Sequence, residues 1–454
     1  MINVINPAIG KIINTYQEHS NKQILKILEN ADSAYNSWKL TSFDLRTILM
    51  RKAADLLHKH KNKYAQLMAE EMGKPVSEGR SEIEKCAWVC NYYAENAKQQ
   101  LNPKIVKTDA HESYISFQPL GVILAVMPWN FPFWQVFRFA APNLMAGNVG
   151  LLKHAFNIPG SALAIEKLFL EAGFPEGCFS TLLISSDEVN TIIENPIVKA
   201  VTLTGSAPAG KAVASKAGEM LKKTVMELGG NDPYVIMADA DLKQTAQTCA
   251  YSRLINTGQS CIAAKRLIVV KEVLSEFESL LQQEMQKATM GDPLNEDTTL
   301  GPLAREDLRN ELHDQVKESI IEGASLLCGG EIHDGPGAFY PPTILTNVKP
   351  GMPAFDDELF GPVAAIIPTE NELEAIKLAN NSKFGLGAAV FTADSARGKQ
   401  IAENELEAGS CFVNTFVKSD PRLPFGGIKE SGYGRELSVL GIREFVNIKT
   451  VYIK

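Results

Sequence analysis

Short runs of Val, Ile and Leu alternate with helical stretches through most of this chain, and this alternation is the feature that most restricts its fold. Continuously apolar strands separated by helices are typical of a parallel sheet with both faces covered. In the first half, the runs predict strands at 121–127, 149–153, 179–184, 200–204 and 224–228, and helices near 133–146, 160–172, 187–195 and 207–221. This half therefore predicts a doubly wound domain of the nucleotide-binding type.

A second alternation of the same kind follows Gly229-Gly230. It predicts strands at 233–237, 264–271, 325–329, 362–367, 387–392 and 410–413, and helices at 241–256, 273–288 and 305–323. We interpret the double glycine as a hinge between two α/β domains, because glycine accepts the dihedrals that a sharp junction needs. Residues 1–100 and 119–229 would then form the first domain and residues 230–440 the second.

Three segments stand apart from these two alternations. Residues 23–100 have a helical pattern, and we interpret their charged side chains as a solvated surface. Residues 112–117 and 445–453 have the composition of strands, and a terminal strand offers unpaired backbone groups to a partner subunit. We therefore expect residues 101–118 and 441–454 to be oligomerisation strands, and the protein to be a homodimer or homotetramer.

Charge and cysteine content exclude several classes of function. The net charge of −8 is spread without a long block of one sign, which argues against nucleic acid or a membrane surface as a partner. No apolar run approaches the roughly 18–20 residues of a membrane span, and the first residues do not predict a signal peptide. The seven scattered cysteines favour a reducing cytoplasm over a disulfide framework. Cys86 and Cys90 lack a second Cys/His pair nearby, so we expect no metal.

Cys261 is the first candidate for chemistry. It ends the polar turn Asn256–Cys261, immediately before the strand-like run Ala264–Val270. Where a loop meets a strand, the strand fixes the orientation of the cysteine side chain but does not enclose it. Such a position suits a nucleophile. The alternative is a structural thiol, because free cysteine is usually a small buried hydrophobe. A catalytic thiol also requires a site that favours the thiolate, since only a few per cent is ionised at neutral pH.

Two other polar residues are candidate partners of this cysteine. Glu227 ends a buried strand, where desolvation would raise its pKa toward the range of a general base; the alternative is a structural ion pair. Asn130 lies in a rigid turn between Pro128 and Pro132. Its amide could stabilise an oxyanion, or it could bond its own backbone as turn asparagines do.

The run Gly205–Ala212 lies between a predicted strand and a predicted helix. It nearly matches the phosphate loop G-x4-G-K-S/T, but Ala212 supplies no hydroxyl for magnesium. Free N–H groups at the start of a helix, capped by Ser206, favour an anion, and a pyrophosphate fits better than a hydrolysed triphosphate. Lys153 ends another strand, where it could bond a ribose or be solvated. Arg138, on an apolar helix, needs either a protein carboxylate or an anionic substrate.

Together these residues resemble the aldehyde dehydrogenase superfamily. The matching stretches follow the family's order: Pro128–Pro132, Lys153, Gly205-Ser206, Glu227–Asn231, Gly258–Cys261, Glu358–Pro362 and Pro424–Gly427. The resemblance implies that Cys261 is the nucleophile, that Glu227 activates water, and that Asn130 and the backbone N–H of Cys261 form the oxyanion hole. It also implies that NAD or NADP is bound by Trp129, Lys153, Thr204, Gly205, Ser206, Leu228, Glu358 and Phe360.

Within this superfamily the chain is most similar to bacterial succinate-semialdehyde dehydrogenases of the shorter type. The similarity implies that Arg138 binds the substrate's distal carboxylate, with help from Ser419, while Ile255 stands where some relatives carry a second arginine. Phe156 stands where many NAD-preferring members carry a glutamate, so NADP is admissible. The alternatives are another short or medium-chain aldehyde such as glutarate semialdehyde, a P-loop nucleotide hydrolase, and a non-catalytic protein that kept the fold.

Overall fold

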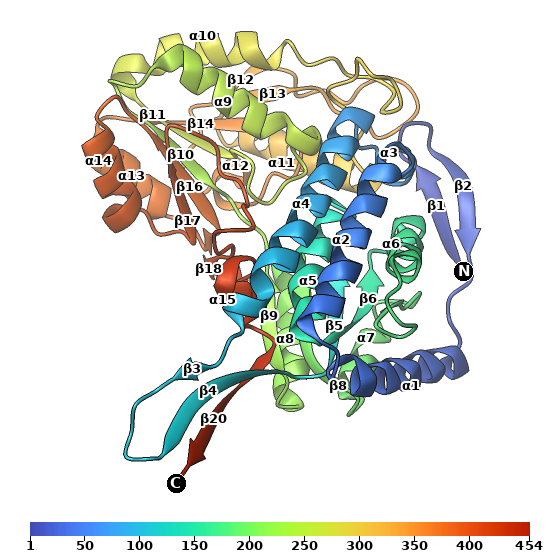
Figure 1. The fold of residues 1–454 in the computed structure, drawn as a ribbon. Helices are drawn as coiled ribbons and strands as arrows, with labels where there is room; N and C mark the ends of the chain where they lie inside the picture. The colour runs from blue at the N-terminus through green and yellow to red at the C-terminus, as the bar shows by residue number, and fades with distance from the viewer.

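Two mainly parallel sheets organise the computed structural model, which describes residues 1–454 (Figure 1). One sheet has six strands in the order β19-β9-β8-β5-β6-β7, and the other has seven in the order β12-β13-β14-β11-β10-β16-β17. Only β19 and β12 run antiparallel to their neighbours. The predicted fold class, two doubly wound α/β units with a small β extension, is confirmed.

The six-stranded sheet contains the five strands predicted for the first half of the chain. Its strands are β5 (Val122–Met127), β6 (Val149–His154), β7 (Phe179–Thr181), β8 (Val198–Thr204), β9 (Lys223–Glu227) and β19 (Gly432–Tyr433). The last of these was not predicted, because two residues carry no periodic pattern. It pairs Gly432 with Glu227, so a late segment of the chain completes the first sheet.

Helices cover both faces of this sheet. They are α1 (Asn21–Trp38), α2 (Phe43–Lys59), α3 (Lys61–Met72), α4 (Val76–Gln100), α5 (Trp134–Ala146), α6 (Pro159–Ala172), α7 (Val189–Glu194) and α8 (Ala207–Glu219). Every residue of α5 is buried, as expected of a helix that is apolar on all sides. Arg138 lies on this helix and is therefore enclosed by protein.

The charged residues of the N-terminal helices do not all form a solvated surface, so that interpretation is wrong in part. The Glu82 carboxylate is buried and accepts hydrogen bonds from the backbone N–H groups of Phe133 and Trp134, both at 2.9 Å. Glu71 likewise accepts from the N–H groups of Gly160 and Ser161. Carboxylates satisfy the free N–H groups at helix starts. These two acidic side chains thus fix the beginnings of α5 and α6.

The seven-stranded sheet forms the second lobe. Its strands are β10 (Pro233–Ile236), β11 (Arg266–Val270), β12 (Ser325–Cys328), β13 (Thr343–Thr346), β14 (Val363–Thr369), β16 (Gly387–Phe391) and β17 (Ser410–Val413). β13 was not predicted, because it is a run of only four residues after two prolines. The helices are α9 (Leu242–Leu254), α10 (Leu274–Met285), α11 (Glu306–Ile321), α12 (Pro353–Asp356), α13 (Glu372–Asn380) and α14 (Ser395–Gln400). The short helix α15 (Ser438–Ile442) follows in the chain but packs against α4 and α5 of the first lobe.

Gly229-Gly230 joins the two sheets, but unusual backbone dihedrals are not the reason for the two glycines. Neither glycine has a positive φ. A Cβ atom on Gly230 would instead lie 2.6 Å from the carbonyl oxygen of Cys261. Close approach of two backbone segments therefore requires glycine at this position.

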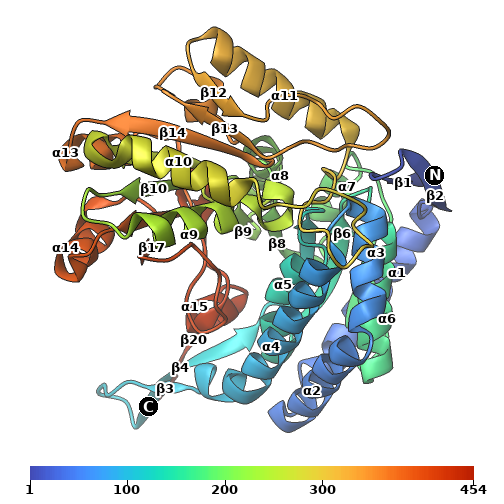
Figure 2. The same ribbon diagram turned by 90° about the horizontal axis from the view of Figure 1, so that it is seen from above.

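A three-stranded arm projects from the body of the molecule (Figures 1 and 2). It is formed by β20 (Val446–Ile453), β4 (Glu112–Pro119) and β3 (Lys104–Ile105), in that order. The two strands predicted outside the domains are thus present and paired with each other. The remaining strands form two small ribbons, β1 (Ile2–Asn6) with β2 (Lys11–Tyr16) and β15 (Phe384–Gly385) with β18 (Ile428–Lys429). None of the helices has the length and apolarity to cross a membrane.

Candidate active site

Cys261 lies between two cavities and lines both of them. The larger cavity, of about 750 Å³, runs along the carboxyl ends of the first sheet's strands and faces α11. The smaller cavity, of about 210 Å³, lies among α4, α5 and the loop between β17 and β18. Gln135 is the other residue shared by the two linings. A thiol in this position can contact a small molecule bound in the smaller cavity and a larger molecule bound in the larger one.

The loop that carries Cys261 is held in an unusual backbone conformation. Asn256 and Thr257 have φ values of 55° and 56°, which end α9 two residues earlier than predicted. Such angles are costly for a β-branched residue. The Asn256 amide compensates by donating to the carbonyl oxygens of Asn130 at 2.7 Å and Gln259 at 3.1 Å. The loop is therefore fixed to the turn that contains Asn130.

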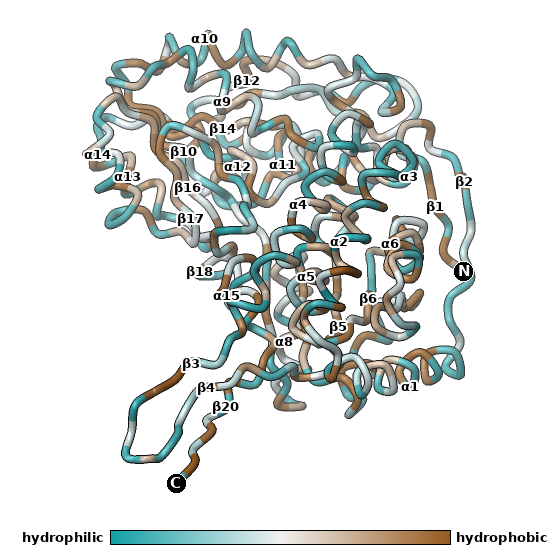
Figure 3. The backbone as a smooth tube through the Cα atoms, in the orientation of Figure 1, coloured by the Kyte–Doolittle hydropathy of each residue, from teal (hydrophilic) through white to brown (hydrophobic).

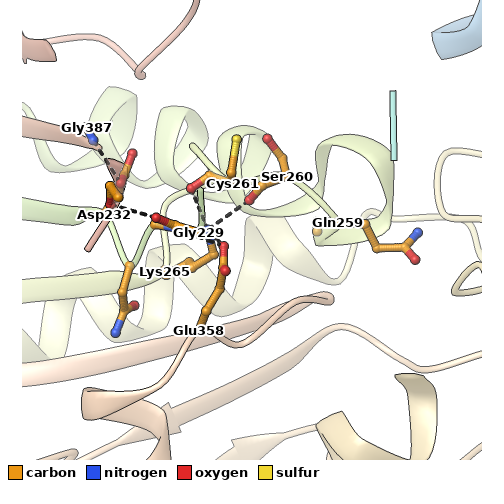
Figure 4. Close-up of polar contacts among 12 residues, drawn as sticks. Gly229, Asp232, Gln259, Ser260, Cys261, Lys265, Glu358 and Gly387 are labelled. Atoms are coloured by element: carbon orange, nitrogen blue, oxygen red, sulfur yellow. Dashed lines mark hydrogen bonds and ion pairs between the residues drawn. The ribbon is translucent and has the colours of Figure 1, made fainter. Parts of the chain in front are cut away.

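Lys265 supports the same loop from behind. Its buried Nζ donates to the carbonyl oxygens of Ser260 at 2.8 Å and Cys261 at 2.7 Å, and lies 3.1 Å from Glu358 Oε1 (Figure 4). Glu358 also accepts a hydrogen bond from the N–H of Gly230 at 3.2 Å. Lys265 was not predicted as part of the site, because it stands at the start of the strand-like run Ala264–Val270. The only signal in the sequence is the pair of cations, Lys265 and Arg266, at the beginning of this otherwise apolar run.

The protonation state of Cys261 differs from expectation. Burial raises the pKa of its thiol to about 12, while the charges of Lys265 and Arg138 act in the opposite direction. The half-buried side chain faces the two cavities and not open solvent. A thiolate would be stabilised by these cations, but they do not offset its loss of hydration. The structure thus holds the thiol protonated at neutral pH, contrary to the expected preference for thiolate.

Asn130 lies beside the loop that carries Cys261 and lines the larger cavity. Its Nδ2 donates to the carbonyl oxygen of Gln259 at 3.1 Å. An amide nitrogen carries two hydrogens, so one donor is left. The backbone N–H of Cys261 has no hydrogen-bond partner within the protein. The site therefore has two free donors on adjacent segments, as an oxyanion hole needs.

Glu227 ends β9 and is almost fully buried. Neither carboxylate oxygen has a hydrogen-bond partner, and the side chain takes part in no ion pair, although the charges of Arg138 and Arg435 lower its pKa. Burial and the neighbouring Glu436 carboxylate raise that pKa well above its usual value. The direction of this shift agrees with the prediction. Glu227 lines neither cavity, so water must reach it, or its side chain must turn, before it can act as a base.

Seven of the eight residues predicted to bind the coenzyme line the larger cavity: Trp129, Thr204, Gly205, Ser206, Leu228, Glu358 and Phe360. The rings of Trp129 and Phe360 meet edge to face, with centroids 5.7 Å apart. Lys153 is buried near the end of β6 and is not among the lining residues.

The start of α8 provides an anion site on the wall of this cavity. Ser206 occupies the N-cap position, but its side chain makes no capping hydrogen bond, contrary to prediction. The first N–H groups of the helix are therefore not consumed by the cap, and they favour a negative charge. Aromatic walls, an anion site and a carboxylate in one cavity of this size fit a dinucleotide.

The predicted substrate residues Arg138 and Ser419 both line the smaller cavity. Of the two partners considered for Arg138, the structure contains the protein carboxylate, because its guanidinium forms an ion pair with Glu436. The same group stacks on Phe425, 4.6 Å from the ring centroid. The Ser419 hydroxyl accepts a hydrogen bond from Lys85 Nζ at 2.8 Å. Lys85 and Glu436 were not identified from the sequence.

Comparisons with known proteins agree over the whole chain. A model of the aldehyde dehydrogenase family matches residues 1–451. A "probable succinate-semialdehyde dehydrogenase" for NADP+ from Synechocystis sp. is 49% identical over 452 residues, covering 100% of this chain and 99% of the relative. The structure of succinic semialdehyde dehydrogenase from Streptococcus pyogenes in complex with NADP+ matches with a TM-score of 0.97 at 40% identity, covering 100% of both chains. An NAD-dependent aldehyde dehydrogenase from Sinorhizobium meliloti matches with a TM-score of 0.96 at 32% identity, covering 100% of this chain and 91% of that one.

Proposed function

The chain belongs to the aldehyde dehydrogenase family, and we propose that it oxidises succinate semialdehyde to succinate with NADP+ or NAD+ as the hydride acceptor. The position of Cys261 carries this proposal. Its thiol borders a small cavity that contains cations and a large cavity that fits a dinucleotide. A cysteine between two such cavities can hold an aldehyde carbon while hydride leaves it.

The proposed mechanism uses three side chains of the site. Cys261 loses its proton and its sulfur adds to the aldehyde carbon, giving a thiohemiacetal whose oxyanion accepts hydrogen bonds from Asn130 and from the N–H of Cys261. A nicotinamide coenzyme, when bound, supplies the hydride acceptor. Loss of hydride from the carbon leaves a thioester on Cys261. Glu227 takes a proton from water, which then attacks the thioester and releases the acid and the thiol.

The coenzyme is proposed to lie in the larger cavity, with its pyrophosphate at the start of α8. Trp129, Thr204, Gly205, Ser206, Leu228, Glu358 and Phe360 would contact it, and Lys153 would reach it only if its side chain turned toward the cavity. Phe156 places no carboxylate near this region, and its ring lies 5.2 Å from the Arg305 guanidinium. A negative 2′-phosphate is therefore not repelled there, which supports NADP+.

We also propose a division of the chain into two domains and a role for the arm in subunit association. Residues 1–100 and 119–229 would form the coenzyme domain and residues 230–440 the catalytic domain. Residues 101–118 and 441–454, which contain the strands of the arm, would join subunits into a homodimer or homotetramer.

Steady-state kinetics with a panel of aldehydes, each with NAD+ and with NADP+, tests this function. We expect kcat/KM to be highest for succinate semialdehyde. Glutarate semialdehyde serves as the comparison for chain length, and butanal serves as the comparison for charge. Equal kcat/KM for butanal and succinate semialdehyde would contradict the proposed substrate. Absence of coenzyme reduction with every aldehyde would favour a non-catalytic protein.

A further inference from the structure

The smaller cavity contains more charge than a site for an uncharged aldehyde needs. Its charged lining residues are Lys74, Glu78, Glu82, Lys85 and Arg138. These residues come from the turn between α3 and α4, from α4 and from α5. Buried charges are stable only when they are paired or hydrogen-bonded. The pairing of each cation therefore indicates which of them is available to a ligand.

Two of the three cations are already neutralised within the protein. Lys74 forms a buried ion pair with Glu82, and Arg138 forms one with Glu436. Arg138 Nη2 also lies 3.4 Å from the Thr204 hydroxyl oxygen. A ligand carboxylate at Arg138 would have to compete with the negative charge of Glu436.

Lys85 is the cation of this cavity without a carboxylate partner. No Asp or Glu oxygen lies within 4.0 Å of its Nζ, which donates to Ser419 Oγ at 2.8 Å and lies 4.4 Å from the ring centroid of Trp134. The nearby Asp420 carboxylate is engaged by Arg422, through contacts of 2.9 and 2.6 Å. Burial is the main cause that lowers the pKa of Lys85, to about 8, and the charge of Arg138 contributes.

We propose that Lys85, together with the Ser419 hydroxyl, binds the distal carboxylate of the substrate and so selects short aldehydes that end in a carboxylate. This inference rests on the proposed function. A carboxylate beside Lys85 Nζ would form a charge-assisted hydrogen bond and neutralise an otherwise unpaired cation. Ser419 accepts from Lys85, and its own hydroxyl hydrogen is free to donate to the second carboxylate oxygen. Arg138 then acts as a positioning residue, held by Glu436 against Phe425.

Replacing Lys85 by methionine tests this assignment, because the length of the side chain is kept and its charge is lost. For Lys85→Met we expect kcat/KM for succinate semialdehyde to fall by at least about 30-fold. Butanal has the same carbon number and no charge, so its kcat/KM should change by less than about threefold. Lys85→Arg should restore much of the preference. Lys98→Met, which removes an exposed lysine of the same helix, is the matched control and should leave both values unchanged.

Binding of succinate gives a second readout that does not depend on turnover. Isothermal titration calorimetry should show a Kd for succinate that rises in Lys85→Met by a factor similar to the kinetic one. Equal losses for both aldehydes would make Lys85 a structural residue and overturn the proposal. An unchanged preference in Lys85→Met would also overturn it while leaving the proposed function intact. A wild-type protein without any preference for succinate semialdehyde would instead contradict the proposed function itself.

The pH dependence separates a charge effect from a packing effect. The groups that face Lys85 are Glu82 and Cys86 from α4, Arg138 from α5 and Asp420 from the loop between β17 and β18. Lys85 is cationic below its pKa of about 8 and neutral above it. The ratio of kcat/KM for succinate semialdehyde to that for butanal should therefore be constant below about pH 7 and fall above pH 8. In Lys85→Met this ratio should be low and independent of pH; a ratio that still falls above pH 8 would overturn the assignment.

Discussion

Cys261 and Glu227 present the same physical problem at the scale of single residues. Both are acids whose conjugate base is proposed to do the chemistry, and burial raises the pKa of both. In the free protein at neutral pH the Cys261 sulfur is thus predominantly protonated. For Glu227, burial and the neighbouring Glu436 carboxylate shift the pKa in the same direction. Turnover then requires that protons leave the site as ligands enter, since the thiolate and the carboxylate are needed at successive steps.

The first prediction concerns the reactivity of the thiol. Because the pKa of Cys261 is raised to about 12, the thiolate fraction should grow about tenfold for each pH unit from 7 to 9. Alkylation of the free protein by iodoacetamide, followed by mass spectrometry of the Cys261 peptide, should show this slope. Cys328 and Cys411 are half-buried and could also react with iodoacetamide. The Cys261→Ala variant measures how much alkylation comes from these other cysteines. A rate that levels off near pH 7 would mean that the site lowers the pKa.

The second prediction concerns Cys261 in turnover. Cys261→Ala removes the sulfur that forms the thiohemiacetal, so kcat should become undetectable. The substitution removes only the Cys261 sulfur from the lining of the coenzyme cavity. The Kd for NADP+, measured by fluorescence titration, should therefore stay within about threefold of wild type. Residual oxidation of succinate semialdehyde would place the nucleophile elsewhere.

The third prediction concerns Glu227. Glu227→Gln keeps the size of the side chain and removes its ability to take a proton, so hydrolysis of the thioester should slow by about 100-fold or more. Stopped-flow absorbance should show a burst of reduced coenzyme of about one per site, followed by a slow steady state. A linear time course at the wild-type rate would show that another group activates water.

Sequence reasoning identified these residues because each interrupts a local pattern: Cys261 ends a turn, and Glu227 ends a buried strand. It could not identify Glu436 or Lys85 as parts of the site. Lys85 appears on a helix with many charges, and Ser419, its hydrogen-bond partner, lies 334 residues away in the chain. Only the folded chain shows which lysine of α4 faces the cavity.

At the scale of elements, segments with a local sequence pattern were predicted, and segments that depend on contacts in the folded chain were not. Strand β5 is a continuous apolar run and β11 is apolar from Leu267 to Val270; such runs appear as hydrophobic segments within the fold (Figure 3). The short strands β13 and β19 have no such signal and exist because a neighbouring strand is available for pairing. The end of α9 was predicted too late because two residues with positive φ stop the helix, and nothing in their composition forces that conformation.

The fourth prediction concerns the loop between α9 and β11. Gly258 has a φ of 74°, and a Cβ atom on it would clash with the carbonyl oxygen of Gly361. Gly258→Ala should therefore displace the Cys261 loop, lower the midpoint of thermal unfolding and reduce kcat by at least about 100-fold. Gly218→Ala is the matched control, since a Cβ there meets nothing within 4 Å and alanine favours the helix. Wild-type kcat in Gly258→Ala would show that the loop tolerates the shift.

At the scale of the whole molecule, the arm is the part whose structure the single chain does not explain. Its outer strand β20 pairs with β4 on one side only, so the other edge offers free backbone donors and acceptors. Large apolar side chains on the arm are also exposed: Ile105 at 81%, Ile448 at 60% and Tyr452 at 51%. Figure 3 shows hydrophobic segments toward the outer end of this arm. An extended ribbon with these features is costly in water unless another surface covers it.

The fifth prediction follows from this cost. If the arms join subunits, a charge within the strand should separate them, because a lysine would be desolvated on association. For Ile448→Lys we expect monomers by size-exclusion chromatography with light scattering at micromolar concentration, where the wild type gives dimers or tetramers. Leu40→Lys changes an equally apolar side chain, 81% exposed on the body, and should leave the assembly intact. The active-site cavities lie away from the arm, so kcat of separated subunits distinguishes an assembly that only stabilises the fold from one that the site requires. A monomeric wild type, or an assembly that survives Ile448→Lys, would remove the arm from subunit association.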